Sequence, residues 1–332
     1  MKKILNEVDQ AVEQMVEGLV KTHSDLVYRV EGTRVIARND KRPGKVGLVS
    51  GGGSGHEPAH AGYVGKGMLS AAVCGDVFTS PTPDQILEGI KAADQGKGVL
   101  LIVKNYTGDV MNFEMAAELA EAEDIRVASV LVNDDIAVED SSFTTGRRGV
   151  AGTVFVHKIV GAAAEAGAGA SLEELQALGE KVVASVKTIG AALSAGTVPE
   201  VGHRGFELPE DEIEVGVGIH GEPGSSREKV MTSHELANLL FARINAELIL
   251  GTEDKIVVLV NGMGATPLME QYIFANDVHQ VIATHGIPIA KTIVGDFMTS
   301  LDMNGISLTI LKLTDEKWLD MVNYPVVTSA WK

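Results

Sequence analysis

The stretch VLLIVKNYTGD at residues 99–109 decides the fold class. Its five leading apolar residues predict a strand that is buried on both faces, and the segment after it has a helical pattern through roughly Ala122. The same order of apolar run, loop and helix-like stretch recurs at 46–55 and 256–264, where the loops are rich in glycine. Strands that alternate with helices predict an α/β fold, in which ligands collect at the carboxyl ends of the strands.

The chain of 332 residues is long enough for about two domains. A segment rich in glycine and proline begins at Ala195 and lacks periodicity, so we place the boundary there. We expect an N-terminal α/β domain at 1–195, which carries the glycine-rich loop, and a C-terminal α/β domain at 196–332. Each domain is expected to hold a β-sheet flanked by helices, and the second sheet is expected to be mixed.

Several further elements are expected from the periodicity of apolar residues. Ser171 and Glu174 form a capping-box pattern at the start of one helix. The expected helices are 148–167, 172–193, 226–250 and 266–285, and the expected strands are 126–132, 212–219, 288–294 and 306–313. Antiparallel pairing in the last two stretches would make the second sheet mixed.

Charge and cysteine content exclude several classes of protein. The chain has 28 basic and 45 acidic residues, a net charge of −17, which would repel a nucleic-acid backbone. Cys74 is the only cysteine, so neither an intrachain disulfide nor a cysteine-based zinc cluster is possible. The sequence shows no export signal and no apolar run that would span a membrane. We therefore expect a cytoplasmic protein that binds neither nucleic acid nor a membrane.

The sequence HEPAH at 56–60 matches the H-E-x-x-H pattern of zinc hydrolases, which needs both histidines one turn apart on a continuous helix. Pro58 argues against this, because proline is not tolerated with a full helical turn before it. We expect instead a helix that begins at about Glu57 and leaves His56 outside as its cap. A zinc hydrolase built on His56 and His60 is kept as an alternative, although we expect no metal on this chain.

The run GGGSG at 51–55 is open to two interpretations. It is either a tight strand-to-helix turn or a nest of backbone N–H groups that binds ligand oxygens at the start of a helix. Three consecutive glycines exceed what a turn needs, which favours the nest, and His56 at its edge would donate or accept a proton. Ser54 lacks the second glycine of a nucleophile elbow and is not expected to be an acyl nucleophile.

Two polar residues follow predicted strands. Asp109 is either a plain charge favoured at a helix N-terminus or a catalytic base. His220 lies at a strand end between Ile219 and Gly221, and is either a hydrogen-bonded core histidine or a functional one. The other histidines, including His157 in a predicted helix, are expected to be structural.

Six blocks of sequence together resemble the dihydroxyacetone kinase family and, within it, the substrate-binding K subunit. The resemblance covers essentially the whole chain in unbroken order. The blocks are GGGSGHEP at 51–58, CGDVFTSPTP at 74–83, KNYTGDVMNFE at 104–114, RRGVAGTVFVHKIVGA at 147–162, GIHGEPG at 218–224 and GDFMTSLDMNGISLTILKL at 295–313.

The resemblance implies a homodimeric, two-domain α/β subunit that binds dihydroxyacetone covalently for phosphorylation to dihydroxyacetone phosphate, a step of glycerol metabolism. The family's covalent histidine falls on His220, whose Nε2 would add to the ketone carbon to form a hemiaminal. The substrate-holding positions fall on Gly53, Ser54, Gly55, Lys104 and Asp109. His56 matches the second active-site histidine.

The chemistry of a small ketone explains why such a bond is useful. Ordinary contacts separate a three-carbon ketone poorly from glycerol, whereas a neutral imidazole attacks only a carbonyl, so His220 would both select and orient the substrate. Asp109 would accept the proton of the terminal hydroxyl as it attacks the phosphoryl group. Lys104 would supply positive charge or a donor to a substrate oxygen. His56 would assist either proton transfer, and the sequence leaves both roles open.

The phosphoryl donor is expected on another polypeptide. The sequence has no P-loop, and GVGIHG at 216–221 is a weak dinucleotide motif because Pro223 and Gly224 follow where a helix should run. By resemblance, a separate L subunit holds the nucleotide and magnesium and is recharged by a phosphotransferase-system protein from phosphoenolpyruvate, so this chain would need no cofactor. The alternative is a non-catalytic paralogue that senses dihydroxyacetone and regulates transcription through a partner.

Overall fold

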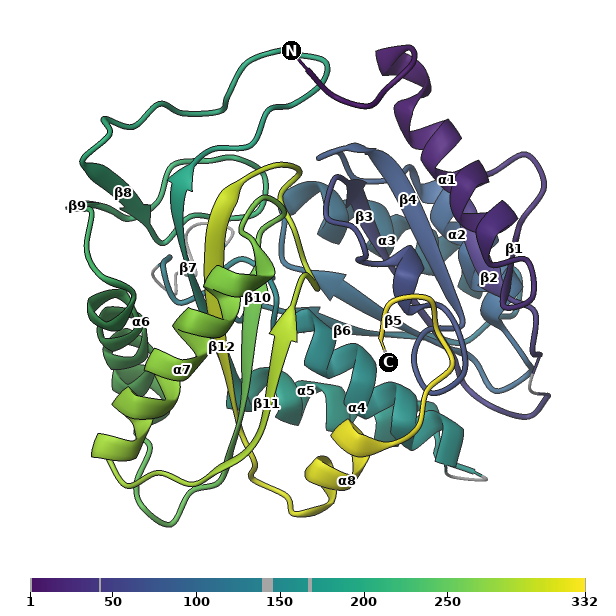
Figure 1. Ribbon diagram of the computed structural model, residues 1–332. Helices are drawn as coiled ribbons and strands as arrows, with labels where there is room; N and C mark the ends of the chain where they lie inside the picture. The colour runs from purple at the N-terminus through teal and green to yellow at the C-terminus, as the bar shows by residue number, and fades with distance from the viewer. Residues whose placement is uncertain (1, 42, 139–145, 167–168, 332) are drawn as a thin grey trace. The chain divides into compact units, whose positions relative to one another are not determined.

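The computed structural model describes residues 2–41, 43–138, 146–166 and 169–331, and these form two compact units. We call the unit made of 2–132, 153–182 and 320–332 the N-terminal unit. The remainder, 133–152 and 183–319, is the C-terminal unit. Each unit contains one six-stranded sheet flanked by helices, which confirms the predicted α/β class (Figure 1).

The sheet of the N-terminal unit has the strand order β1-β2-β4-β3-β5-β6. Strands β4, β3, β5 and β6 run parallel, and β1 and β2 add an antiparallel edge. A core of aliphatic side chains and Phe113 lies between this sheet and the helices α2 and α3. The strands are β1 (Val27–Arg29), β2 (Val35–Arg38), β3 (Gly47–Ser54), β4 (Ala71–Val77), β5 (Val99–Lys104) and β6 (Val127–Val132); the helices are η1 (Val8–Gln10), α1 (Ala11–Thr22), η2 (Ala61–Tyr63), α2 (Pro83–Ala93), α3 (Thr107–Glu121), α4 (Thr153–Ala166) and α5 (Leu172–Ser185).

The sheet of the C-terminal unit has the order β11-β10-β12-β7-β8-β9. Only β10 and β11 pair in parallel, so this sheet is mixed, as predicted. Helices α6 and α7 pack against it and bury Phe241 and Phe274 (Figure 1). The elements are β7 (Val186–Ser194), β8 (Glu212–Val215), β9 (Ser226–Lys229), α6 (Ser233–Leu248), β10 (Ile256–Gly262), α7 (Leu268–Thr284), β11 (Ile289–Gly295) and β12 (Asn304–Lys312). Helix α8 (Lys317–Asn323) begins at the end of this unit, and its residues from Asp320 onward belong to the N-terminal unit.

The glycine run at 51–55 differs from its prediction as a loop that leads into a helix. Gly51, Gly52, Gly53 and Ser54 lie inside strand β3, and turns rather than an α-helix follow at 55–60. The reason is a close approach of backbones. A Cβ on Gly51 would lie 2.6 Å from the carbonyl oxygen of Val73 on the neighbouring strand. The helix predicted to begin at Glu57 was therefore wrong.

Three helix boundaries were also wrong. The helix predicted for 172–193 ends at Ser185, because 186–194 form β7 between β12 and β8. An apolar run of this kind suits a buried strand as well as a helix, and only its pairing decides between them. The region 226–250 begins with β9, and α6 starts only at Ser233, where Thr232 is the N-cap and forms a capping box with Glu235. The helix expected from residue 148 begins at Thr153, whereas the capping box of Ser171 and Glu174 is confirmed.

The two units do not divide the chain at residue 195. Residues 133–152 and 183–195 belong to the C-terminal unit, because β7 is an inner strand of its sheet. Residues 320–332 return to the N-terminal unit, where Ala330 N–H donates to the carbonyl of Gly62. The two C-terminal strands, β11 and β12, do not pair with each other, since β10 lies between them.

Candidate active site

A buried ion pair joins Lys104 and Asp109 in the N-terminal unit. Lys104 ends β5 and Asp109 lies in the first turn of α3, so the strand-to-helix connection brings the two side chains together. Lys104 Nζ lies 3.2 Å from Asp109 Oδ2, and the side chains are 0% and 5% exposed. The carboxylate also benefits from the positive end of the helix dipole. A charge pair so completely buried is costly to break from either side.

Gly52 leaves the space that the ammonium group occupies. Lys104 Nζ donates to the carbonyl of Gly51 at 3.4 Å. A Cβ on Gly52 would lie 2.4 Å from Lys104 Nζ and 3.3 Å from Asp109 Oδ2, and the φ of Gly52 is +152°. The glycines of β3 thus form one wall of the Lys104–Asp109 site, and a side chain at Gly52 would displace the ammonium group.

The other residues of the glycine segment bond within the protein. Ser54 Oγ donates to the carbonyl of Gly75 at 2.7 Å. The N–H of Gly55 donates to both carboxylate oxygens of Glu57, at 3.1 and 3.0 Å. Burial raises the pKa of Glu57, and the backbone N–H groups partly offset this rise. An internal carboxylate therefore occupies one N–H group that we expected to bind ligand oxygens.

His56 is fully buried on the same stretch of chain. Its ring stacks on Phe78, with the centroids 5.1 Å apart and the planes 16° from parallel. Phe78 has a positive φ of 55°, and its backbone lies against β3, because a Cβ on Gly53 would approach Phe78 Cα to 2.7 Å. The stacking restrains the orientation of the His56 ring.

A pair of histidines, His60 and His157, lies in the core of this unit. His60 Nδ1 is 2.8 Å from His157 Nε2 on α4 and 3.3 Å from Ser50 Oγ on β3. Burial, followed by the nearby charge of Lys104, lowers the pKa of His157 to about 3 and holds the pKa of His60 well below its usual value. Both rings are therefore neutral at physiological pH, and the sequence reasoning missed their pairing.

The conformation of residues 55–60 bears on the alternative of a zinc hydrolase. The H-E-x-x-H pattern needs one helix that carries both histidines, whereas 55–60 are turns and a 3-10 helix starts only at Ala61. Within the described residues, no group of three or more His, Cys, Asp or Glu side chains is arranged to hold a metal ion. The structure gives no support to a zinc centre on His56 and His60.

His220 lies in the C-terminal unit, in the loop between β8 and β9. Its side chain is partly exposed, and its backbone N–H donates to Glu222 Oε2 at 2.8 Å. Glu222 Oε1 accepts in turn from Arg148 Nη1 at 2.9 Å. Arg148 and Glu222 stood in the blocks quoted for the resemblance but received no role. Only the folded contacts could show that they hold this loop.

Comparison with known proteins supplies the family. The Dak1 domain model matches residues 17–330, almost the whole of the described structure. The chain belongs to the Dak1 domain family. The described residues of both compact units fall within the matched range apart from 2–16 and Trp331, so the Lys104–Asp109 pair and the His220 loop are both parts of a Dak1 domain.

Individual Dak1 relatives resemble the chain over its full length. The PTS-dependent dihydroxyacetone kinase 1, dihydroxyacetone-binding subunit DhaK, of Listeria innocua is 77% identical over 331 residues, covering 100% of each chain. The solved structure of the dihydroxyacetone kinase operon co-activator Dha-DhaQ is 40% identical, with a TM-score of 0.90 over 98% of this chain and 99% of that one. The dihydroxyacetone kinase of C. freundii is 35% identical with a TM-score of 0.92, covering 99% of this chain and 60% of that one.

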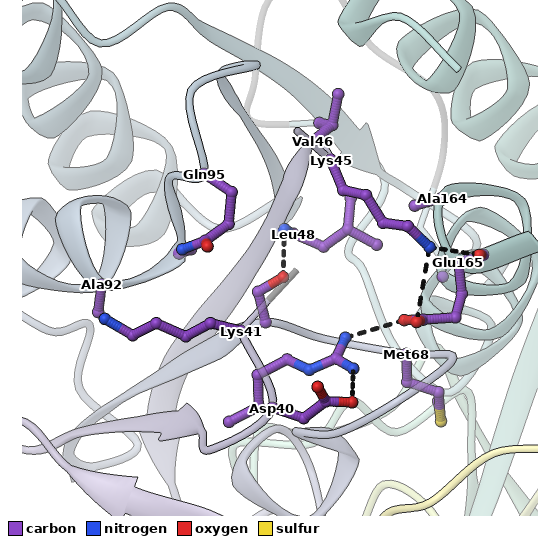
Figure 2. Close-up of a pocket in the computed structure, with 14 residues that line it drawn as sticks. Asp40, Lys41, Lys45, Val46, Leu48, Met68, Ala92, Gln95, Ala164 and Glu165 are labelled. Carbon is purple, nitrogen blue, oxygen red and sulfur yellow. Dashed lines mark hydrogen bonds and ion pairs between the residues drawn. The ribbon is translucent and has the colours of Figure 1, made fainter. Parts of the chain in front are cut away.

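A separate pocket of this Dak1 chain, in the N-terminal unit, has a cavity of ≈ 30 Å³ (Figure 2). Glu165, near the end of α4, forms ion pairs with Arg38 Nη1 at 2.9 Å and with Lys45 Nζ at 3.6 Å. These pairs connect α4 to β2 and to the segment before β3. None of the predicted site residues lines this pocket, so we interpret it as a structural ion-pair cluster.

No helix among the described residues is both long and apolar enough to cross a bilayer.

Proposed function

We propose that this chain is the dihydroxyacetone-binding subunit of a dihydroxyacetone kinase. The observation that carries the proposal is the buried Lys104–Asp109 pair against the glycine strand, which offers a carboxylate and an ammonium group in a fixed arrangement. The 77% identity to a subunit of that name, over the whole chain, supports it. Such a subunit binds the triose and presents its hydroxyl to a phosphoryl donor.

In the proposed reaction, His220 binds the ketone covalently. The lone pair of Nε2 attacks the carbonyl carbon, the C=O π electrons move to oxygen, and the oxygen gains one proton as the ring loses the proton of Nδ1. The product is a neutral hemiaminal, formed without loss of any atom. Because glycerol has no carbonyl group, the same step excludes it.

Asp109 is proposed as the base for phosphoryl transfer. The terminal hydroxyl of dihydroxyacetone attacks phosphorus, the donor's P–O bond breaks, and the hydroxyl proton passes to the carboxylate. Lys104 holds that carboxylate in place and offers positive charge to a substrate oxygen. His56 assists the proton transfer at the hydroxyl or at the carbonyl oxygen. Gly53, Ser54 and Gly55 would border the bound triose.

We further propose that the phosphoryl group comes from phosphoenolpyruvate, through phosphotransferase-system proteins and a separate subunit that holds a nucleotide and magnesium. The phrase "PTS-dependent" in the name of the 77% identical relative supports this donor. We propose a homodimer for this chain, which light scattering coupled to gel filtration tests by its molar mass.

The second candidate function is transcriptional co-activation. It is favoured by the TM-score of 0.90 to the operon co-activator, which means that the fold does not separate the two functions. Under this candidate, the chain would bind dihydroxyacetone and transmit the signal to a partner without phosphorylating it.

Reconstitution distinguishes the two. The purified chain is mixed with a nucleotide-binding subunit and the phosphotransferase proteins, and dihydroxyacetone phosphate is measured by a coupled NADH assay. We expect product with phosphoenolpyruvate and none with ATP alone. Product with ATP alone would overturn the proposal that phosphoenolpyruvate is the donor. If dihydroxyacetone binds but neither donor gives product, co-activation would be favoured.

A further inference from the structure

Glu222 links the backbone of His220 to the partly buried guanidinium group of Arg148. One carboxylate oxygen accepts the N–H of His220 at 2.8 Å, and the other accepts Arg148 Nη1 at 2.9 Å. The loop is shaped around this carboxylate, because a Cβ on Gly218 would lie only 1.7 Å from Glu222 Oε1. The conformation at position 220 therefore depends on where the Glu222 side chain is held.

Arg148 is itself held on two further sides. Its Nε donates to Asp135 Oδ2 at 2.7 Å, its Nη2 lies 2.6 Å from the same oxygen, and Nη2 also donates to the carbonyl of Gly216 at 3.0 Å. The Asp135 side chain is 1% exposed. Burial raises the pKa of Asp135 to about 6 against the opposing charge of Arg148. A guanidinium group with these three contacts has one available orientation.

The segment that carries Arg148 is fixed to the sheet of the same unit. Asp134 accepts the N–H of Val150 at 2.8 Å and that of Gly152 at 2.7 Å through its two carboxylate oxygens. The carbonyl of Asp134 accepts the N–H of Thr188 on β7 at 2.9 Å. Hydrogen bonds and ion pairs thus connect β7 to the His220 loop through residues of the C-terminal unit.

We propose that Asp135, Arg148 and Glu222 form a positioning relay that holds the backbone of His220 so that its ring attacks the ketone in one orientation. The inference rests on the proposed role of His220 in binding dihydroxyacetone. None of the three is proposed to touch the substrate. Attack on a carbonyl depends on the alignment of the reacting atoms, and a partly exposed ring on an irregular loop loses that alignment when the backbone is free.

The test is the equilibrium binding of dihydroxyacetone labelled with ¹³C at the ketone carbon. NMR follows the loss of the ketone signal and the appearance of the sp³ hemiaminal carbon. We expect Glu222→Ala and Arg148→Met to raise the apparent Kd about tenfold or more. Glu222→Gln keeps an oxygen acceptor for the His220 N–H but loses the acceptor for Arg148 Nη1, so its apparent Kd should lie between those of the wild type and Glu222→Ala.

A matched control exists in the same unit. Arg147 forms a two-bond ion pair with Glu247, at 2.8 and 3.1 Å, and Glu247 lies on α6, outside the His220 loop. Glu247→Ala removes an Arg–Glu pair of the same kind and should leave the apparent Kd within about twofold of the wild type.

The outcomes of the titrations test the relay and the proposed function separately. Wild-type affinity in folded Glu222→Ala and Arg148→Met would overturn the relay and leave the proposed function intact. An equal loss in Glu247→Ala would reduce the relay to a general effect on stability, and would also overturn it. If Glu222→Ala does not fold, Arg148→Met decides the question by the same titration. A wild-type protein with no hemiaminal signal would remove the proposed function, and the relay with it.

Discussion

The Lys104–Asp109 site and the His220 loop are built in opposite ways. The first is fully buried, comes from a strand end and a helix start, and joins its charged groups directly. The second is partly exposed, lies in an irregular loop, and is held by a side chain bonded to its backbone. Substitutions at the first site should therefore change stability and activity together. Substitutions in the second should change substrate binding with little effect on stability.

The largest effect is expected at position 220. His220→Ala should abolish covalent binding of dihydroxyacetone and remove discrimination against glycerol, because no nucleophile is left on the loop. The melting temperature should stay near that of the wild type, since the ring is partly exposed. Competition binding with glycerol and a thermal scan measure the two quantities. Unchanged selectivity for the ketone would contradict the assignment.

Asp109→Asn should lower both the turnover number and the stability of the protein. We expect kcat in the reconstituted system to fall by ~10²–10⁴, with dihydroxyacetone still bound, because the proton acceptor is lost. The free energy of unfolding should fall by ~3–5 kcal/mol, because Lys104 loses its buried partner. Chemical denaturation and steady-state kinetics measure these changes.

Two control proteins sharpen this prediction. Lys104→Met combined with Asp109→Asn removes both charges and should recover most of the stability without recovering kcat. Asp211→Asn breaks the exposed pair with Lys229 and should change neither quantity. If Asp109→Asn turned over substrate like the wild type, Asp109 would not be the base.

The smallest effect concerns the buried histidine pair and is a dependence on pH. His157 has a pKa of about 3 in the folded protein and 6.5 as an ordinary histidine. Between these values the unfolded state binds more protons, so stability should fall as the pH falls, by about 1.5 kcal/mol for this residue between pH 6.5 and 5. His157→Gln should flatten the curve of unfolding free energy against pH.

His279 provides the comparison for that experiment. It is exposed and bonds Thr292 Oγ1 at 2.7 Å, so His279→Gln is the matched substitution outside the buried pair. If the curve of His157→Gln were as steep as that of the wild type, the histidine pair would not be the source of the acid sensitivity.

The position of the Lys104–Asp109 site could be predicted because its information is local. Five apolar residues, a short connection and a helical pattern place Lys104 at a strand end and Asp109 in a first helical turn. The seven-residue motif around His220 was identified in the sequence, but the strand predicted for 212–219 ends at Val215, so His220 lies in a loop and not at a strand end.

The remaining features depend on contacts between distant segments. His60 and His157 are 97 residues apart, and Arg148 and Glu222 are 74 apart, so no spacing rule connects them. The glycines at 51–53 were predicted as a loop because the close approach of Val73 and Phe78 is visible only in the folded sheet. The segment 186–194 was predicted as helix for the same reason, since its pairing with β12 decides its conformation.

The central claim, that His220 forms a bond to the ketone, has one direct measurement. Protein labelled with ¹⁵N in the histidine rings is mixed with dihydroxyacetone labelled with ¹³C at its central carbon, and NMR detects the one-bond ¹³C–¹⁵N coupling. We predict a coupling in the wild type that is lost in His220→Ala and retained in His56→Gln. A bound triose without any such coupling, or a coupling that persists in His220→Ala, would contradict the claim.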